Sequence, residues 1–280
     1  MSGWRFVLNR RWAGYLLATL VFALACVLLS NWQFARLDEA KAENAKVAAN
    51  WDAAPRPLTE VLADREGWDD TLKWTPVEMT GTYLVEEQLL VRNRPLNGQP
   101  GFDVLTPLRL DDGSVFVVDR GWLPTGSAQD APDSIPAPPE GRVTVVARMK
   151  AGEPTLPNRS APEGQIATVN LPTVQDLVGE NTYLNAYGLL ASETPPVADR
   201  PIALERPPED EGPHFSYALQ WIAFGLMGFF GLGWAIRTEY RIANADDPAE
   251  RKRAAERQRK QDARGPTDSD IEDALLDRVD

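Results

Sequence analysis

The chain has 280 residues and a formal net charge of −12, from 29 basic and 41 acidic side chains. This acidic balance argues against nucleic-acid binding, which needs a basic surface. The chain contains one cysteine, Cys26, which excludes an intrachain disulfide and a two-cysteine copper site within this chain alone.

Two long apolar runs divide the sequence. The first covers residues 13–34 and the second covers 217–236, and neither contains a charged side chain. A helix of about 20 apolar residues is long enough to cross a bilayer. The first run is longer than the core of a signal peptide and lacks a clear small-residue cleavage site, so we interpret it as a retained membrane anchor.

The charges around these runs predict the topology. Basic residues flank them on the terminal sides: Arg5, Arg10, Arg11, Arg237, Arg241, Arg251, Lys252, Arg253, Arg257, Arg259 and Lys260. The segment between the runs, 36–213, holds 16 basic and 29 acidic residues. Because positive flanks stay in the cytoplasm, both termini are predicted to be cytoplasmic and the middle to face outward. The 12 residues before the first run are short for an organelle transit peptide, which favours a bacterial plasma membrane.

The middle segment alternates short β-favouring runs with Gly and Asn-Gly turns, after a helical continuation of the first span over 36–50. Strands are predicted over 75–84, 88–94, 103–110, 114–119, 142–149, 165–169, 182–192 and 202–206. Short helices are predicted over 58–65 and 172–178. Asp112-Gly113 is a good hairpin signal. This spacing predicts a mainly antiparallel sheet, curled or sandwiched.

We therefore expect a membrane protein of the α+β class, with two antiparallel transmembrane helices flanking a mainly antiparallel β domain outside the cytoplasm. The predicted segments are a cytoplasmic N-terminus (1–12), a first span (13–34), the β-rich domain (35–213), a second span (214–236) and a cytoplasmic tail (237–280). The tail is charged and poor in apolar residues from Asn244 onward, which predicts disorder with a short helix near 270–276.

The only histidine, His214, lies at the start of the second span. Small residues let membrane helices approach closely, and a stripe that includes such residues is predicted on each span. The stripe on the first span contains Gly14, Ala18, Val21, Ala25, Leu28 and Trp32. The stripe on the second span contains His214, Tyr217, Ala218, Trp221, Gly225, Gly228 and Leu232. In an antiparallel pair, Trp32 and His214 share the outer end, with Tyr217 and Trp221 just below and Arg36 nearby.

An imidazole among aromatic rings at a water boundary suits a planar iron macrocycle with carboxylate arms. His214 could ligate the iron, the rings could pack on the macrocycle, and Arg36 could pair with a propionate. The plainer alternative is an ordinary interfacial belt of Trp and Tyr with a polar boundary histidine. One histidine leaves the iron five-coordinate unless a partner or a second copy supplies another ligand, so a homo-oligomer stays open.

Two polar–aromatic segments stand out in the middle of the chain, 92–95 and 119–124. They could line a surface toward the membrane or a partner. In the structural alternative, Gly121 and Pro124 form the turn after a strand and Trp122 fills the core. Catalysis is not expected, because the sequence lacks a nucleophile elbow, a phosphate-binding glycine loop and zinc-ligand spacing.

These residues resemble the surfeit-locus cytochrome oxidase assembly proteins, a family of two-span membrane proteins. The resemblance covers roughly residues 4–242 and its motifs stand in the family's order. They are Trp32-Gln33, Arg36, Lys41, Gly81, Tyr83, Asn93-Arg94-Pro95, Gly101, Thr106-Pro107-Leu108, Gly113, Arg120-Gly121-Trp122-Leu123-Pro124, His214, Tyr217, Ala218 and Trp221. The sequence departs from the family at Asp119, where Asn is common, and at Gly212-Pro213 before the histidine.

The resemblance implies a role in maturing haem–copper oxidase around haem a and subunit I. In bacterial members the matching histidine is associated with haem a binding, so the resemblance implies His214 as a haem ligand, with Arg120 and Trp122 as candidates to face the site from the β domain. The leading hypothesis is a non-enzymatic factor that binds haem a transiently, with subunit I, the haem a synthesis machinery and membrane lipid as partners. The alternatives are a haem-independent scaffold for an assembly intermediate and a membrane-anchored sensor that uses the tail.

Overall fold

The computed structural model describes residues 3–65, 67–127, 130–179 and 181–263, which form two compact units. One unit combines Met1–Asp38 with Gly212–Asp280 and is helical; the other, Glu39–Glu211, is mostly β. Helix α1 (Arg10–Asn50) contributes residues to both. The short helix predicted near 270–276 lies outside the described residues.

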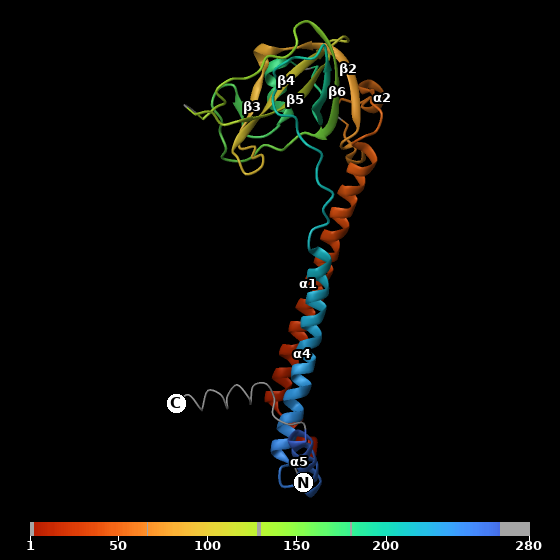
Figure 1. The fold of residues 1–280 in the computed structure, drawn as a ribbon, viewed down its shortest axis with the longest axis vertical. Helices are drawn as coiled ribbons and strands as arrows, with labels where there is room; N and C mark the ends of the chain where they lie inside the picture. Colours follow the sequence, from red (N-terminus) through yellow and green to blue (C-terminus); the bar gives the residue numbers. More distant parts are fainter. Residues whose placement is uncertain (1–2, 66, 128–129, 180, 264–280) are drawn as a thin grey trace. The chain divides into compact units, whose positions relative to one another are not determined.

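The helical unit contains η1 (Gly3–Leu8), the first part of α1, α4 (His214–Ala243) and α5 (Pro248–Asp262). Helices α1 and α4 run antiparallel (Figure 1). Ser30 of α1 donates a hydrogen bond to the Ala218 carbonyl near the start of α4, and Arg11 forms an ion pair with Glu239 near its end. The prediction of two apolar helices that flank a mostly β segment is confirmed.

Both helices are long and apolar enough to cross a membrane, and few residues in their apolar stretches are buried by the protein itself. On α4, Phe230 is 76% exposed and Trp234 is 70% exposed. A core helix of a globular domain would bury such rings, whereas a helix surrounded by lipid leaves them on its surface.

The face that α1 presents to α4 differs from the predicted stripe. The six predicted residues, Gly14, Ala18, Val21, Ala25, Leu28 and Trp32, are all exposed. Cys26, Ser30 and Gln33 are buried instead. Close approach uses Cys26 and Ser30 of α1 rather than its Gly and Ala residues: a Cβ at Gly225 would lie 3.5 Å from the Cys26 Cβ, and Ser30 bonds to the carbonyl of the buried Ala218.

The tail also differs from its prediction. Helix α4 continues to Ala243, past the predicted end at 236, and α5 occupies part of the segment that was expected to be disordered. Asp247 caps α5 by accepting a hydrogen bond from the Ala249 amide, and Glu250 pairs with Arg253 one turn later. Capping and such pairs stabilise a polar helix without apolar burial, which composition alone does not indicate.

In its described residues, the β unit contains eight strands and four short helical segments. The strands are β1 (Arg56–Pro57), β2 (Pro76–Tyr83), β3 (Leu89–Val91), β4 (Gly101–Leu110), β5 (Val115–Pro124), β6 (Arg142–Ala151), β7 (Gln165–Ile166) and β8 (Ala186–Thr194). The helical segments are α2 (Leu58–Val61), η2 (Asp70–Leu72), η3 (Val85–Glu87) and α3 (Leu171–Val178).

Five strands close into a barrel in the order β2–β6–β8–β5–β4, and β4 pairs back onto β2. Strands β5 and β8 are parallel, as are the marginal pairs β1–β2 and β3–β7, so the sheet is mixed, but the long pairings are antiparallel as predicted. Gly81 lies where β2 meets both β4 and β6; a Cβ there would come within 2.2 Å of the Arg109 carbonyl oxygen. Closure of the barrel therefore depends on a residue without a side chain at this position.

Strand β5 shows how the core is divided. Phe116 and Val118 join the cluster that fills the barrel, whereas Val117 between them joins a second cluster on the outside. The outer cluster includes Val47 of α1 and Val174 of α3, so the strand is covered on both faces. This explains why β5 is apolar without alternation over 115–118.

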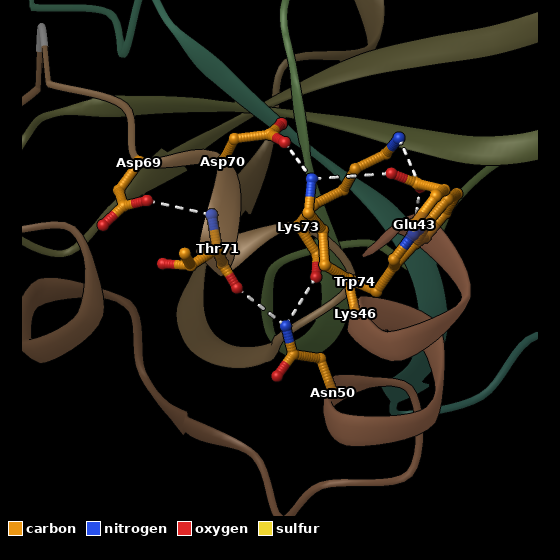
Figure 2. A network of polar contacts seen from close by, with 8 residues as sticks. All are labelled: Glu43, Lys46, Asn50, Asp69, Asp70, Thr71, Lys73 and Trp74. Carbon is orange, nitrogen blue, oxygen red and sulfur yellow. Dashed lines mark hydrogen bonds and ion pairs between the residues drawn. The ribbon is translucent and has the colours of Figure 1, made fainter. Parts of the chain in front are cut away.

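The last three turns of α1 are fastened to the β unit by a polar network, drawn in Figure 2. Glu43 accepts hydrogen bonds from the Trp74 indole at 3.1 Å and from Lys73, whose Nζ lies 2.6 Å from the carboxylate. Lys46 pairs with Asp70, and the Asn50 amide donates to the carbonyls of Thr71 and Lys73, each at 2.8 Å. Burial raises the pKa of Glu43, but the bonds from Lys73 and Trp74 outweigh it and the net pKa is lowered.

Candidate functional site

His214 is the first residue of α4, and its half-buried imidazole is held by a neutral partner on α1. The Nδ1 atom of His214 lies 2.8 Å from the Oε1 atom of Gln33, which is buried. Because a carboxamide oxygen only accepts hydrogen bonds, Nδ1 is the donor of this bond, and in the neutral form of the ring the lone pair is then on Nε2. Histidines that ligate metals share this arrangement, in which the second ring N–H donates to a protein oxygen.

One turn further along α4, the Ser30 hydroxyl donates to the Ala218 carbonyl at 3.1 Å. Both residues are buried between the helices. The Ser30 and Gln33 contacts lie on the same face of α1, three residues apart. They fix the start of α4 against α1 and thereby fix the direction of the imidazole.

Aromatic rings surround this end of the helix pair, but not all in the predicted way. Trp221 is half-buried and stands edge-on to Phe224 at 5.7 Å between centroids. Tyr217 and Trp32 are 47% and 56% exposed, on the outer surface of their helices. Phe34 and Phe215 follow Gln33 and His214 in the sequence. Their rings meet edge-on, with centroids 6.5 Å apart.

Sequence reasoning missed the partner of the imidazole and the Phe34–Phe215 pair. The available signal was Gln33 itself, a carboxamide at the end of an apolar run, whose polar atoms need a partner within the protein. Arg36 follows Gln33 by one turn of α1, on a neighbouring position of the same face.

These residues fit the chemistry of a haem site at a water boundary. His214 would hold the iron through a ring nitrogen, Phe34, Phe215 and Trp221 supply apolar rings, and Arg36 supplies a cation suited to a carboxylate. A bound haem would supply a redox-active iron centre at this place. The roles of His214, Tyr217, Trp221, Trp32 and Arg36 in such a site stay predictions.

Arg120 lies inside the β unit and is fully buried. Its guanidinium donates to the carbonyls of Pro136 and Ala137 at 2.8 and 3.2 Å, and its centre lies 5.7 Å from the Tyr83 ring. Glu193 is 3.9 Å away and accepts a hydrogen bond from the Tyr83 hydroxyl at 3.0 Å. Burial lowers the pKa of Arg120, whereas Glu193 opposes that change. These contacts fasten the proline-rich loop after β5 to the barrel.

Trp122 is buried, as the structural alternative expects, and its indole donates to the Arg94 carbonyl at 2.6 Å. Gly121 and Pro124 do not form a turn, however, because β5 continues through Pro124 and pairs with β4 to its end. The side chains of Arg120 and Trp122 are thus engaged within the β unit, and their proposed orientation toward a haem stays a prediction.

A group of carboxylates is buried beside the same strand. Burial raises the pKa of Asp119 well above its usual range, and the neighbouring Asp103 raises it further. Burial also raises the pKa of Asp103 to about 6, although Arg94, 3.2 Å away, opposes it.

Comparison with known proteins supports the resemblance over most of the chain. The model of the SURF1 family matches residues 20–226. A SURF1-like protein of Mycobacterium tuberculosis is 30% identical over 84% of this chain and 87% of its own length. A SURF1-like protein of Rickettsia bellii is 23% identical over 81% of this chain and 89% of its own. The cytochrome oxidase assembly protein SHY1 of Saccharomyces cerevisiae is 30% identical over 41% of this chain and 29% of its own.

Proposed function

This chain belongs to the SURF1 family, and from that premise we propose that it assists the assembly of cytochrome oxidase in a bacterial plasma membrane. The similarity to the yeast cytochrome oxidase assembly protein SHY1 supports the proposal. So do the two exposed apolar helices, which in this topology cross the membrane and leave both termini in the cytoplasm. The β unit then faces outward, and the chain acts by binding rather than by catalysis.

The finer proposal is that the chain holds haem a transiently through His214 and assists its transfer to subunit I. The observation that carries it is the hydrogen bond between His214 Nδ1 and Gln33 Oε1, which leaves Nε2 as the nitrogen that the neutral ring can offer to iron. The haem a synthesis machinery would supply the haem. A carrier should hold its ligand only moderately, because the acceptor must bind it more tightly.

A haem-independent scaffold is the second candidate, because the same His214–Gln33 bond also ties the two helices together. The carrier and the scaffold are distinguished by complementation: cells that lack the protein receive the wild-type chain or a variant, and their oxidase content is measured. We expect the wild-type chain to restore haem a absorbance and oxidase activity to membranes. On the carrier proposal, His214→Ala restores neither to more than a small fraction, although the variant accumulates normally in the membrane.

His214→Asn serves as the matched variant, because its side-chain amide can still donate to Gln33 while offering no nitrogen lone pair to iron. If His214→Asn restores the oxidase fully, the histidine acts only as a tie between helices and the scaffold is correct. If deletion of the whole chain leaves oxidase content unchanged, the assembly role itself is wrong.

A further inference from the structure

A cavity of about 520 Å³ opens at the opposite end of the helix pair from His214, within the helical unit. Three elements form it: η1, the last turns of α4, and α5. Four arginines line it, two from α4 and two from α5: Arg237, Arg241, Arg253 and Arg257. Four cations around one cavity form a strong site for an anion.

The cavity contains one carboxylate, that of Glu250, and the two arginines of α5 neutralise it. Glu250 is buried, with its oxygens 2.8 Å from Arg253 and 3.7 Å from Arg257. Across the described part of the chain, Arg237 and Arg241 form no ion pair with an acidic residue. The cavity thus keeps an excess of positive charge, supplied mainly by the end of α4, where the helix dipole also favours cations.

One wall of the cavity is apolar. Trp4 of η1 stacks on Tyr240 of α4 with ring centroids 4.3 Å apart and planes 22° apart. Ile236 lies one turn before Tyr240 and continues the wall toward the exposed apolar surface of α4. Stacked Trp and Tyr rings next to an apolar helix surface are typical of the boundary between headgroups and acyl chains.

We propose that this cavity binds an anionic phospholipid of the cytoplasmic leaflet. Its phosphate is held by Arg237 and Arg241, and its acyl chains lie along α4 beyond Ile236. A free phosphate would satisfy the arginines but leave the apolar wall without a ligand, whereas a phospholipid matches both. Clusters of arginine just cytoplasmic of a membrane helix are suited to acidic lipids. The inference rests on the proposed membrane topology and not on haem binding.

Native mass spectrometry of the detergent-purified full chain tests the proposal, with phosphatidylglycerol, phosphatidylcholine and inorganic phosphate as probes. We expect phosphatidylglycerol to bind at least about tenfold more tightly than phosphatidylcholine, and inorganic phosphate to bind far more weakly than either. In the double variant Arg237→Gln/Arg241→Gln, the affinity for phosphatidylglycerol should fall to about the affinity for phosphatidylcholine. Circular dichroism should show unchanged helix content, since neither arginine is buried.

The matched control is Lys252→Gln/Arg259→Gln, which removes the same charge from exposed positions of α5 outside the cavity. We expect it to keep the lipid preference. An equal loss in both double variants would mean diffuse attraction and overturn the proposal, as would inorganic phosphate binding as tightly as phosphatidylglycerol. Because lipid binding is measured on the purified chain, its failure is independent of whether the protein supports oxidase assembly in cells.

Discussion

The β barrel and the helix pair bury different kinds of polar side chain. The β unit buries ionisable groups, including Arg120, which donates to two loop carbonyls, and Asp119, which accepts a hydrogen bond from the Gly121 amide. At the His214 end of the helix pair, the buried polar side chains are the neutral Ser30 and Gln33. Polar burial in the β unit thus maintains its structure, whereas in the helix pair it orients the His214 imidazole, which we propose as the haem ligand.

The largest expected effect is on the barrel side. Arg120→Ala should lower the free energy of unfolding by about 3–5 kcal/mol, because it leaves Glu193 buried without its cation and frees two loop carbonyls. Chemical denaturation of the full chain in detergent, followed by near-UV circular dichroism, measures this. The control Arg142→Ala breaks an exposed ion pair with Asp111 and should cost less than about 1 kcal/mol. Equal effects of the two substitutions would contradict a structural role for Arg120.

On the helix side, Gln33→Leu should weaken haem a binding by about 10-fold to 100-fold, because His214 loses the acceptor that fixes its orientation and protonation. Titration of the purified chain with haem a, followed by visible absorbance, measures the affinity. Gln33→Glu keeps an acceptor and should bind haem a more tightly than Gln33→Leu. If Gln33→Leu binds like the wild type, the hydrogen bond does not orient a ligand.

The buried carboxylates predict how the barrel responds to pH. Asp103 has a folded-state pKa of about 6, above its ordinary value, so the folded protein binds this proton more tightly than the unfolded chain. Stability should therefore increase by about 1 kcal/mol as the pH falls from 7 to 5. Carboxylates whose pKa is lowered in the folded protein, such as Glu43 and Glu153, make it less stable as the pH falls, but only below the range from pH 7 to pH 5.

Asp103→Asn supplies the comparison for this pH effect. The variant should lose the contribution of Asp103 and show a smaller increase in unfolding free energy between pH 7 and pH 5. Denaturant titrations of both proteins at several pH values measure the difference. An unchanged increase in the variant would assign the effect to other groups.

The smallest effect is expected at Ser30. Ser30→Ala removes one hydrogen bond between the helices and should destabilise the helix pair by about 0.6 kcal/mol, the average for such bonds in a membrane. The midpoint of unfolding in mixed micelles of increasing dodecyl sulfate content measures this. A loss as large as that of Arg120→Ala would remove the distinction between the two regions.

Local patterns predicted the strands β2, β4 and β6 almost to their ends, because alternation and glycine turns fix them within a few residues. Closure of the barrel was missed because it depends on the β5–β8 and β2–β4 pairings, which join segments far apart in sequence. His214 was predicted from its position and from being the only histidine. Its partner Gln33 was missed because the contact face of α1 contains Cys26, Ser30 and Gln33 rather than the predicted Gly and Ala stripe.

The haem content of the purified full chain tests the central claim most directly. Wild type and His214→Ala would each be produced with the haem a synthesis enzymes, purified in detergent, and compared by reduced-minus-oxidised absorbance and pyridine haemochrome assay. The account predicts haem a in the wild-type protein and its near-complete loss in the variant, at equal protein yield and helix content. Equal haem content in the two proteins, including none in either, would contradict a haem site at His214.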